Sequence, residues 1–365
     1  MKKRIFLRIL AVFCVMALTL LVFRLIFPEG KLLPQMQQLD PGLEIRQYDF
    51  LTSIFNTDCR ISLFGTRQQV HQAYQRVSEE LFRLHNALNR FAEQSEVSRF
   101  NNTPAGTAFP CSPQLWRAFE TAGMAYAETD GAFDVTIGPL MAFWKKHAVD
   151  GEVPAEELDA IRRRIGFPLL KLDAANHTVT KSVEGLQVDF GGLAKGLALD
   201  VAREILLEEG LENCYLDFGG NTYQKLPKDH PYRDLCAIKD LRPLPDGTFP
   251  TSPRCTIQSA DGRFLGTSSN AYRALSQDAT RPAGHILDPQ TGTPAAPTYV
   301  SLTAVADSGW RSDAYSTAVF AKGAPLARKI AAAHPDCAFL FLPLTDDAPE
   351  IIGSATLQEA PSQNP

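Results

Sequence analysis

Four short segments of the sequence carry residue types that could do chemistry, and the first is a glycine-rich turn. Residues 189–200 read DFGGLAKGLALD, so the glycines stand where a predicted strand turns into a predicted helix. Glycines at such a turn let the backbone approach a phosphate, and a helix N-terminus favours the negative charge. Lys195 adds a cation in the first turn. The segment is neither a Walker A loop nor a GxGxxG motif, so alone it is a weak indication of a phosphate site.

A second segment, residues 311–318 (RSDAYSTA), places a carboxylate and a hydroxyl four residues apart. On a helix, Asp313 and Thr317 would lie on the same face. Their oxygens are hard ligands of the kind that Mg²⁺ prefers. The structural alternative is that Asp313 interacts with a helix dipole and that Thr317 hydrogen-bonds to the preceding turn.

A third segment, residues 285–292 (HILDPQTG), contains consecutive turns that would present His285 at the end of a short strand. A lone histidine is more often structural than catalytic. Imidazole nevertheless titrates near neutral pH, so His285 is the natural candidate for a base that activates a hydroxyl.

The fourth segment, residues 130–140 (DGAFDVTIGPL), has backbone bends at Gly131 and at Gly138-Pro139. Phe133 and Asp134 lie between the bends. Such a loop could place an aromatic ring and a carboxylate against a flat polar ligand. The alternative is a turn that merely ends a helix.

The elements that must position these groups form an α+β pattern. The expected helices span residues 66–89, 112–129, 193–209, 312–321 and 326–333, and the expected strands span residues 58–64, 213–218, 299–306 and 337–342. Residues 179–190 resemble a hairpin around Glu184-Gly185, and residues 227–253 resemble surface loops. Strands and helices alternate without a βαβ rhythm, which favours a mixed or antiparallel sheet.

The N-terminus predicts a membrane anchor. Basic residues at positions 2, 3, 4 and 8 precede an apolar run over residues 9–23, with no cleavage pattern after it. A cleaved signal peptide is the alternative. We expect an anchor over residues 1–28, a tether over 29–50, a catalytic domain over 51–345 and a polar tail over 346–365. The N-terminus would be cytoplasmic and the domain periplasmic, at a bacterial inner membrane.

Charge and cysteine content exclude other classes of protein. The net charge of −5 gives no basic footprint for nucleic acid. Six cysteines follow Cys14, and none has CxxC or Cys/His metal spacing, so we expect buried or paired thiols. The sequence does not assign disulfide pairs.

Six motifs in this order resemble the ApbE family of FAD:protein FMN transferases. The resemblance covers residues 52–342. The motifs lie at residues 95–101 (SEVSRFN), 131–144, 189–200, 219–220, 285–294 and 313–318.

The resemblance implies a T-fold-like α+β fold, the ApbE-like flavin transferase fold, with FAD in a cleft. The residues that would contact FAD are Ala132, Phe133, Asp134, Asp189 and Lys195. Two further aromatic residues replace family residues near the flavin: Phe55 stands in a usual Met position and Phe91 in a usual Tyr position. Mg²⁺ would take Asp313, Thr317 and the backbone carbonyl of Gly192.

The resemblance also implies a reaction. A Thr or Ser hydroxyl of a target flavoprotein subunit would attack the FMN phosphorus of FAD, and AMP would leave. His285 would accept the hydroxyl proton. Two alternatives remain open: hydrolysis of FAD to FMN and AMP, and a periplasmic flavin-binding protein without transfer. The chain carries no acceptor motif of the kind that these transferases modify, so we do not expect it to be its own substrate.

Overall fold

The computed structural model describes residues 46–150, 153–244, 246–258, 262–271, 284–354 and 358–359. Within these ranges, no helix combines the length and the apolar character that a membrane crossing requires. The predicted anchor over residues 1–28 lies outside the described residues, as does most of the predicted tether.

An eight-stranded sheet forms the centre of the fold, in the order β1-β2-β6-β7-β10-β13-β14-β15. Every pair of neighbours is antiparallel. The strands are β1 (Arg46–Ile54), β2 (Thr57–Gly65), β6 (Cys214–Phe218), β7 (Asn221–Lys225), β10 (Arg263–Ser269), β13 (Tyr299–Ala306), β14 (Ala338–Pro343) and β15 (Glu350–Gly353). The α+β prediction is confirmed, and the main sheet is antiparallel.

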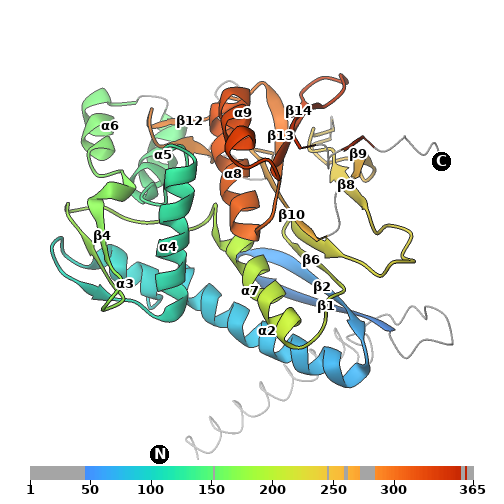
Figure 1. Cartoon of the computed structure of the whole chain (residues 1–365). Coiled ribbons are helices and arrows are strands. Elements are labelled where there is room, and N and C mark those ends of the chain that lie inside the picture. Colours follow the sequence, from blue (N-terminus) through green and yellow to red (C-terminus); the bar gives the residue numbers. More distant parts are fainter. Residues whose placement is uncertain are drawn as a thin grey trace, which may run out of the picture.

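The helices gather on one face of this sheet and beside it. They are α2 (Arg67–Leu88), α3 (Glu96–Asn102), α4 (Pro113–Glu128), α5 (Gly138–Asp150), α6 (Ala155–Arg162), the short η1 (Phe167–Leu169), α7 (Ala194–Glu208), α8 (Gly309–Lys322) and α9 (Ala324–Ala333). Figure 1 shows α4, α5 and α6 grouped on one side of the molecule, the main sheet on the other side, and α7 and α8 between them.

Alternation along the strands explains which face the helices cover. In β6, Cys214, Leu216 and Phe218 are fully buried, whereas Tyr215 and Asp217 are only half-buried. Side chains of a strand point alternately to the two faces. The apolar face of β6 therefore packs in the core with α2 and α7, and the polar face is left for a cleft.

A second, smaller sheet packs on the opposite face of the main sheet. Its strands are β8 (Leu235–Lys239), β9 (Pro253–Gln258) and β16 (Gln358–Glu359), in the order β16-β9-β8. Ile238 and Ile257 share an apolar cluster with Leu265 and Leu340 of the main sheet. The main-sheet residue next to Leu340, Phe339, belongs instead to the core on the helix side.

Two shorter sheets complete the fold around the helical side. One has the order β3-β5-β4, and the other pairs β11 with β12. Their strands are β3 (Phe109–Pro110), β4 (Leu170–Asp173), β5 (Thr178–Lys181), β11 (Leu287–Asp288) and β12 (Thr293–Pro294).

Most of the predicted helices and strands are confirmed within a few residues, and α4 shows why. Ser112 caps this helix by accepting the N–H of Leu115 at 3.2 Å, and Pro113 occupies the first turn. Leu115, Phe119 and Ala122 recur at helical spacing and are buried. Local signals therefore define the start, the end and the buried face.

The hairpin predicted over residues 179–190 is wrong in its second arm. β5 pairs with β3 on one edge and with β4 on the other, so no edge is left for a following strand. Gln187 instead forms an isolated parallel bridge with Ile137. Residues 186–190 therefore run beside the start of α5, not back along β5.

Three boundaries also differ from the prediction. The tether was expected to reach residue 50, but β1 begins at Arg46. The region 227–253, expected as surface loops, contains β8. The polar tail expected from residue 346 contains β15, where Ile351 and Ile352 supply two half-buried residues that pair with β14. In each case a short segment with apolar residues stands within polar or proline-rich flanks.

Candidate active site

One large cleft, with a volume of about 2070 Å³, brings together most of the predicted site residues. These residues come from five separate segments of the chain. They are Phe91, Ala132, Phe133, Asp134, Asp189, Gly192, Lys195, His285, Asp313 and Thr317. The segments are far apart in sequence, so the fold produces this grouping.

The carboxylate of Asp313 lies where α7 and α8 meet. Its Oδ2 accepts the N–H of Gly196 at 2.9 Å, and its Oδ1 lies 3.2 Å from Nζ of Lys195. Only 3% of Asp313 is exposed. The carboxylate is therefore fixed at one oxygen by a helix amide, while its other oxygen faces a cation at the cleft wall.

Thr317 and Gly192 lie beside this carboxylate. The Thr317 hydroxyl donates to the backbone oxygen of Asp313 at 3.1 Å and lies 3.3 Å from Oγ of Ser268. A Cβ added to Gly192 would lie 3.2 Å from Oγ1 of Thr317 and 3.1 Å from the ring of Phe133. The backbone around Gly192 thus approaches Thr317 closely, and a side chain at residue 192 would crowd that approach.

The oxygens of Asp313, Thr317 and Gly192 form a donor set that fits Mg²⁺, because all three are hard ligands. No group of three His, Cys, Asp or Glu side chains that could hold a metal occurs in the part of the chain that the structure describes. A metal here would therefore depend on one carboxylate together with a hydroxyl and a carbonyl. The structural alternative for Thr317, a bond to the preceding turn, is also observed.

Asp189 fixes the glycine turn before α7. Its Oδ1 accepts the N–H of Gly191 at 2.8 Å, and its Oδ2 lies 2.5 Å from Nη1 of Arg90. Arg90 was not predicted as a site residue. Its position next to Phe91, just before the motif at residues 95–101, is the signal that could have suggested it.

The motif at residues 95–101 supports the same turn from the other side. Ser95 caps α3, and Asn101 near its end exchanges two hydrogen bonds with the backbone of Val188. The Asn101 amide donates to the Val188 oxygen at 3.0 Å and accepts the Val188 N–H at 2.7 Å. The motif therefore positions the residue that precedes Asp189.

The predicted contact residue Asp134 is itself part of the scaffold. Its Oδ1 accepts the N–H and the hydroxyl of Thr136, at 2.8 and 2.6 Å, and its Oδ2 accepts the N–H of Phe167 at 2.9 Å. Burial raises the pKa of the Asp134 carboxyl, although these bonds oppose the shift. Ala132 and Phe133 lie in the same buried turn.

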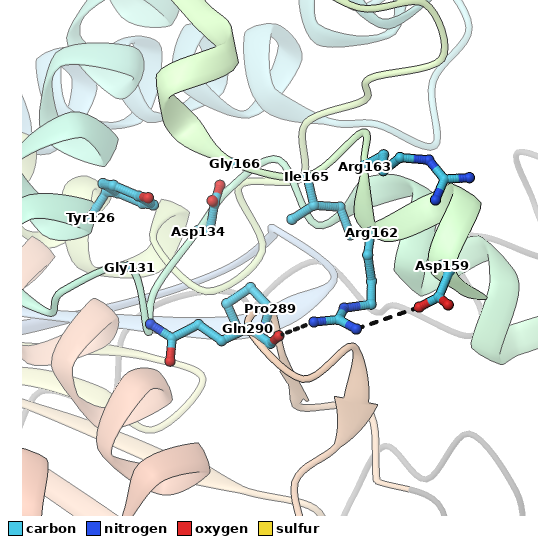
Figure 2. A pocket seen from close by; sticks show the side chains of 10 residues that line it. All are labelled: Tyr126, Gly131, Asp134, Asp159, Arg162, Arg163, Ile165, Gly166, Pro289 and Gln290. Atoms are coloured by element: carbon cyan, nitrogen blue, oxygen red, sulfur yellow. Dashed lines mark hydrogen bonds and ion pairs between the residues drawn. The ribbon is translucent and has the colours of Figure 1, made fainter. Parts of the chain in front are cut away.

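A smaller hollow of about 450 Å³ adjoins the cleft and shares Asp134 and Pro289 with it. Figure 2 shows the Asp134 carboxylate between Tyr126 and Gly166, with Arg162 on the opposite side of the hollow. Arg162 donates to the backbone oxygen of Gln290 at 3.0 Å. The hollow therefore joins the turn at residues 130–140 to the turn that follows His285.

The turns after His285 hold this residue at the cleft. Asp288 accepts the N–H of Gln290 at 2.9 Å through Oδ1, and its Oδ2 lies 2.6 Å from Nζ of Lys322 on α8. The N–H of Gly292 donates to the backbone oxygen of Asp288 at 2.8 Å. His285 is therefore tied through its own turn to the helix that carries Asp313.

Phe55 does not line the cleft, in contrast to the prediction. It occupies a two-residue turn between β1 and β2, where Phe55 and Asn56 have φ values of 54° and 56°. This turn directs Phe55 toward α2: its N–H donates to Nδ1 of His85 at 3.1 Å, and its ring meets the His85 ring edge-on at 5.3 Å. Phe55 is thus outside this cleft, whereas Thr57 and Asp58 line it.

Phe91 does line the cleft and is 76% exposed. An exposed ring at the rim provides stacking area for a flat ligand. Sequence reasoning missed Tyr215 and Asp217, which line the cleft from β6. Their alternation with buried apolar residues in the predicted strand was the available signal.

Comparison with known proteins gives one consistent family. A sequence model of the ApbE family matches residues 55–341. The chain is 31% identical over 265 residues to the FAD:protein FMN transferase of Vibrio cholerae, covering 71% of this chain and 76% of the relative. It is 26% identical over 255 residues to the FAD:protein FMN transferase of Escherichia coli K12, covering 67% and 69%.

Solved structures agree with the sequence comparison. The flavin transferase ApbE from Vibrio cholerae superposes with a TM-score of 0.69 at 25% identity, covering 86% of this chain and 98% of that protein. The ApbE protein from Thermotoga maritima superposes with a TM-score of 0.72 at 26% identity, covering 85% and 98%.

Proposed function

The chain belongs to the ApbE family, and from this premise we propose a Mg²⁺-dependent mechanism for an FAD:protein FMN transferase. The enzyme transfers FMN from FAD to a target protein, as its relatives are named for doing. In the proposed reaction, a Thr or Ser hydroxyl of the target attacks the FMN phosphorus. A phosphoester bond forms, the bond to the AMP phosphate breaks, and AMP leaves with the electron pair.

The observation that carries this proposal is the junction of Asp313, Thr317 and Gly192 in the same cleft as His285. Asp313 and Thr317 would hold the ion together with the Gly192 carbonyl. When bound, Mg²⁺ would neutralise charge on the bridging oxygen and on the leaving phosphate.

The remaining roles fall to side chains already at the cleft. His285 would accept the proton of the attacking hydroxyl. Lys195, now 3.2 Å from Asp313, would offset phosphate charge in the loaded site. Phe91 and Phe133 offer aromatic surface for the flavin or the adenine, and the Arg90–Asp189 pair would hold the glycine turn beside the phosphates.

We also propose that residues 1–28 anchor the enzyme in a bacterial inner membrane with its catalytic domain in the periplasm. The support is the basic N-terminal segment followed by an apolar run long enough to span a bilayer. The target would then be a flavoprotein subunit that exposes a Thr or Ser on the same side of that membrane.

The test uses the full-length chain in detergent with FAD, Mg²⁺ and a protein that carries an acceptor Thr. The intact mass of the acceptor is measured with and without EDTA. A metal-dependent gain of one FMN unit, with release of AMP, supports the proposal. Free FMN and AMP without a modified acceptor would favour the hydrolase, and FAD binding without turnover would favour a binding protein.

The role of His285 has its own test. His285→Ala should retain FAD binding and lose transfer, because the base is removed while the binding surface stays. The control is His71→Ala, since His71 is exposed on α2 and does not line the cleft. Transfer by His285→Ala at a rate close to that of the parent chain would contradict the assignment of the base.

A further inference from the structure

Helices α7 and α8 lack N-terminal caps of their own. The residues at their N-cap positions, Leu193 and Ser308, make no side-chain cap hydrogen bond, and neither first turn contains an acidic residue. Unpaired N–H groups at a helix start need acceptors, above all where they are buried. The acceptors for these two helices must come from elsewhere in the chain.

Each helix receives its cap from the other. Asp313 of α8 accepts the N–H of Gly196 in the first turn of α7, at 2.9 Å. Asp200 of α7 accepts the N–H groups of Gly309 and Trp310, the first two residues of α8, at 2.6 and 2.9 Å. The two carboxylates thus form a reciprocal pair of caps across one helix junction.

The backbones touch at the same junction. A Cβ on Gly196 would lie 2.1 Å from the oxygen of Gly309, and a Cβ on Gly309 would lie 2.2 Å from the oxygen of Gly196. Gly196 and Asp200 are four residues apart, as are Gly309 and Asp313, so each pair lies on one helix face. The junction therefore has little freedom to slide.

The proposed metal ligands lie on both sides of this junction. Gly192 lies two residues before α7 begins, whereas Asp313 and Thr317 belong to α8. Their relative positions depend on how the start of α8 is seated on α7. Asp200 does not line the cleft, so any effect that it has on the site must act through this seating.

We propose that Asp200 is a positioning residue for the metal site: its carboxylate fixes the start of α8 against α7 and thereby sets the affinity for the divalent cation. This inference rests on the metal site of the proposed function. Asp200 belongs to the motif at residues 189–200, and the reaction assigns it no other role.

Asp200 is buried, so its carboxylate is poorly solvated and must be held in place by its hydrogen-bond partners. The residue is 8% exposed, and burial raises the pKa of its carboxyl to about 6. The groups that face it are the N–H groups of Gly309 and Trp310 and, farther away, the charges of Arg117 and Glu204. A charged cap is therefore kept where burial penalises the charge.

The test measures metal binding directly, with Mn²⁺ as the probe and the full-length chain saturated with FAD. Free Mn²⁺ is counted from its EPR signal during a titration. Asp200→Asn should raise the dissociation constant of Mn²⁺ about tenfold, while kcat at saturating Mg²⁺ stays within about threefold of the parent chain. The matched control is Glu204→Gln, one turn along the same helix, which removes the ion pair with Arg117 and should leave Mn²⁺ binding unchanged.

A second variant separates position from charge. Asp200→Glu keeps the charge but lengthens the side chain by one methylene group, so a positioning role predicts that it also weakens Mn²⁺ binding. Parent-like Mn²⁺ affinity in both variants, or a loss of thermal stability alone, would overturn the inference. If the parent chain itself binds no Mn²⁺, the metal site of the proposed function fails, and this outcome is distinct from a failure of Asp200 alone.

Discussion

Two groups of helices in this protein begin in different ways, and the difference separates the scaffold from the site. α2, α3 and α4 are capped by the residue immediately before them, namely Thr66, Ser95 and Ser112. α7 and α8 are capped by carboxylates that lie 117 and 109 residues away in the sequence. The scaffold helices can therefore form from local signals, whereas the site helices complete each other only when both are in place.

The largest effect that this comparison predicts is for Asp313→Ala. The change removes the cap of α7 and a proposed metal ligand together. FMN transfer should fall by at least about a hundredfold, and its dependence on Mg²⁺ should flatten. Transfer is measured by acceptor mass over a Mg²⁺ titration. A Mg²⁺ titration identical to that of the parent chain would contradict the metal assignment.

Gly309→Ala tests the backbone contact of the site helices. The new Cβ would meet the Gly196 oxygen at 2.2 Å, so the helices must separate, at a cost of about 3 kcal/mol in the free energy of unfolding. Gly123→Ala in the scaffold helix α4 is the control. Its Cβ would meet only the Phe167 ring, at 3.0 Å, and we expect a change of no more than about 1 kcal/mol. Urea unfolding measures the free energy of unfolding of both variants. Equal losses in the two variants would contradict the difference between the site helices and the scaffold helices.

The buried cap of α8 also predicts a pH dependence of stability. Burial raises the pKa of Asp200 from its ordinary value of 3.8 to about 6. The Asp200 carboxyl therefore binds its proton more tightly in the folded state than in the unfolded state. The contribution of this protonation to the free energy of unfolding is complete below pH 3.8 and is lost as the pH rises through 6.

The expected size follows from the same two pKa values. Between pH 4.5 and pH 7, the free energy of unfolding of the parent chain should fall by about 2 kcal/mol relative to that of Asp200→Asn. Urea unfolding of the two chains at several pH values measures this difference. Parallel pH profiles would show that Asp200 keeps its ordinary pKa.

The smallest effect is expected for a local cap. Ser112→Ala should cost about 1 kcal/mol of stability, because the N–H of Leu115 loses its acceptor. FMN transfer and Mn²⁺ binding should stay unchanged, since α4 does not carry the proposed ligands. A shift in the Mn²⁺ dissociation constant for this variant would mean that scaffold and site are coupled after all.

The same difference explains how much the sequence could predict. The start of α4 was predicted from Ser112, and α4 begins at Pro113. The start of α8 was expected at Ser312, but the helix begins at Gly309. Ser308 stands at its N-cap position without a side-chain cap hydrogen bond, and Asp200 accepts the N–H of Gly309 instead. A helix start that is capped by the preceding residue can be predicted from the sequence, whereas a cap supplied by another helix cannot.

The candidate site shows the same limit. Family motifs pointed to the residues of the cleft, among them Asp189, His285 and Asp313, and these do lie together. Phe55 does not line the cleft, because a turn with positive φ directs it toward His85. Arg90 was missed because its partner Asp189 is 99 residues away. Position in a motif therefore identified the segments of the site but not every side chain that faces it.

The order of strands in the main sheet has a consequence for biosynthesis. From β1 to β15, the spatial order follows the order along the chain, and each strand pairs with the main-sheet strand made just before it. A nascent polypeptide can therefore extend the sheet at a single growing edge as it emerges. That edge stays open at β14 until Glu350–Gly353 has been synthesised and paired with it, so this short strand covers an edge of β14 that could otherwise pair with another chain.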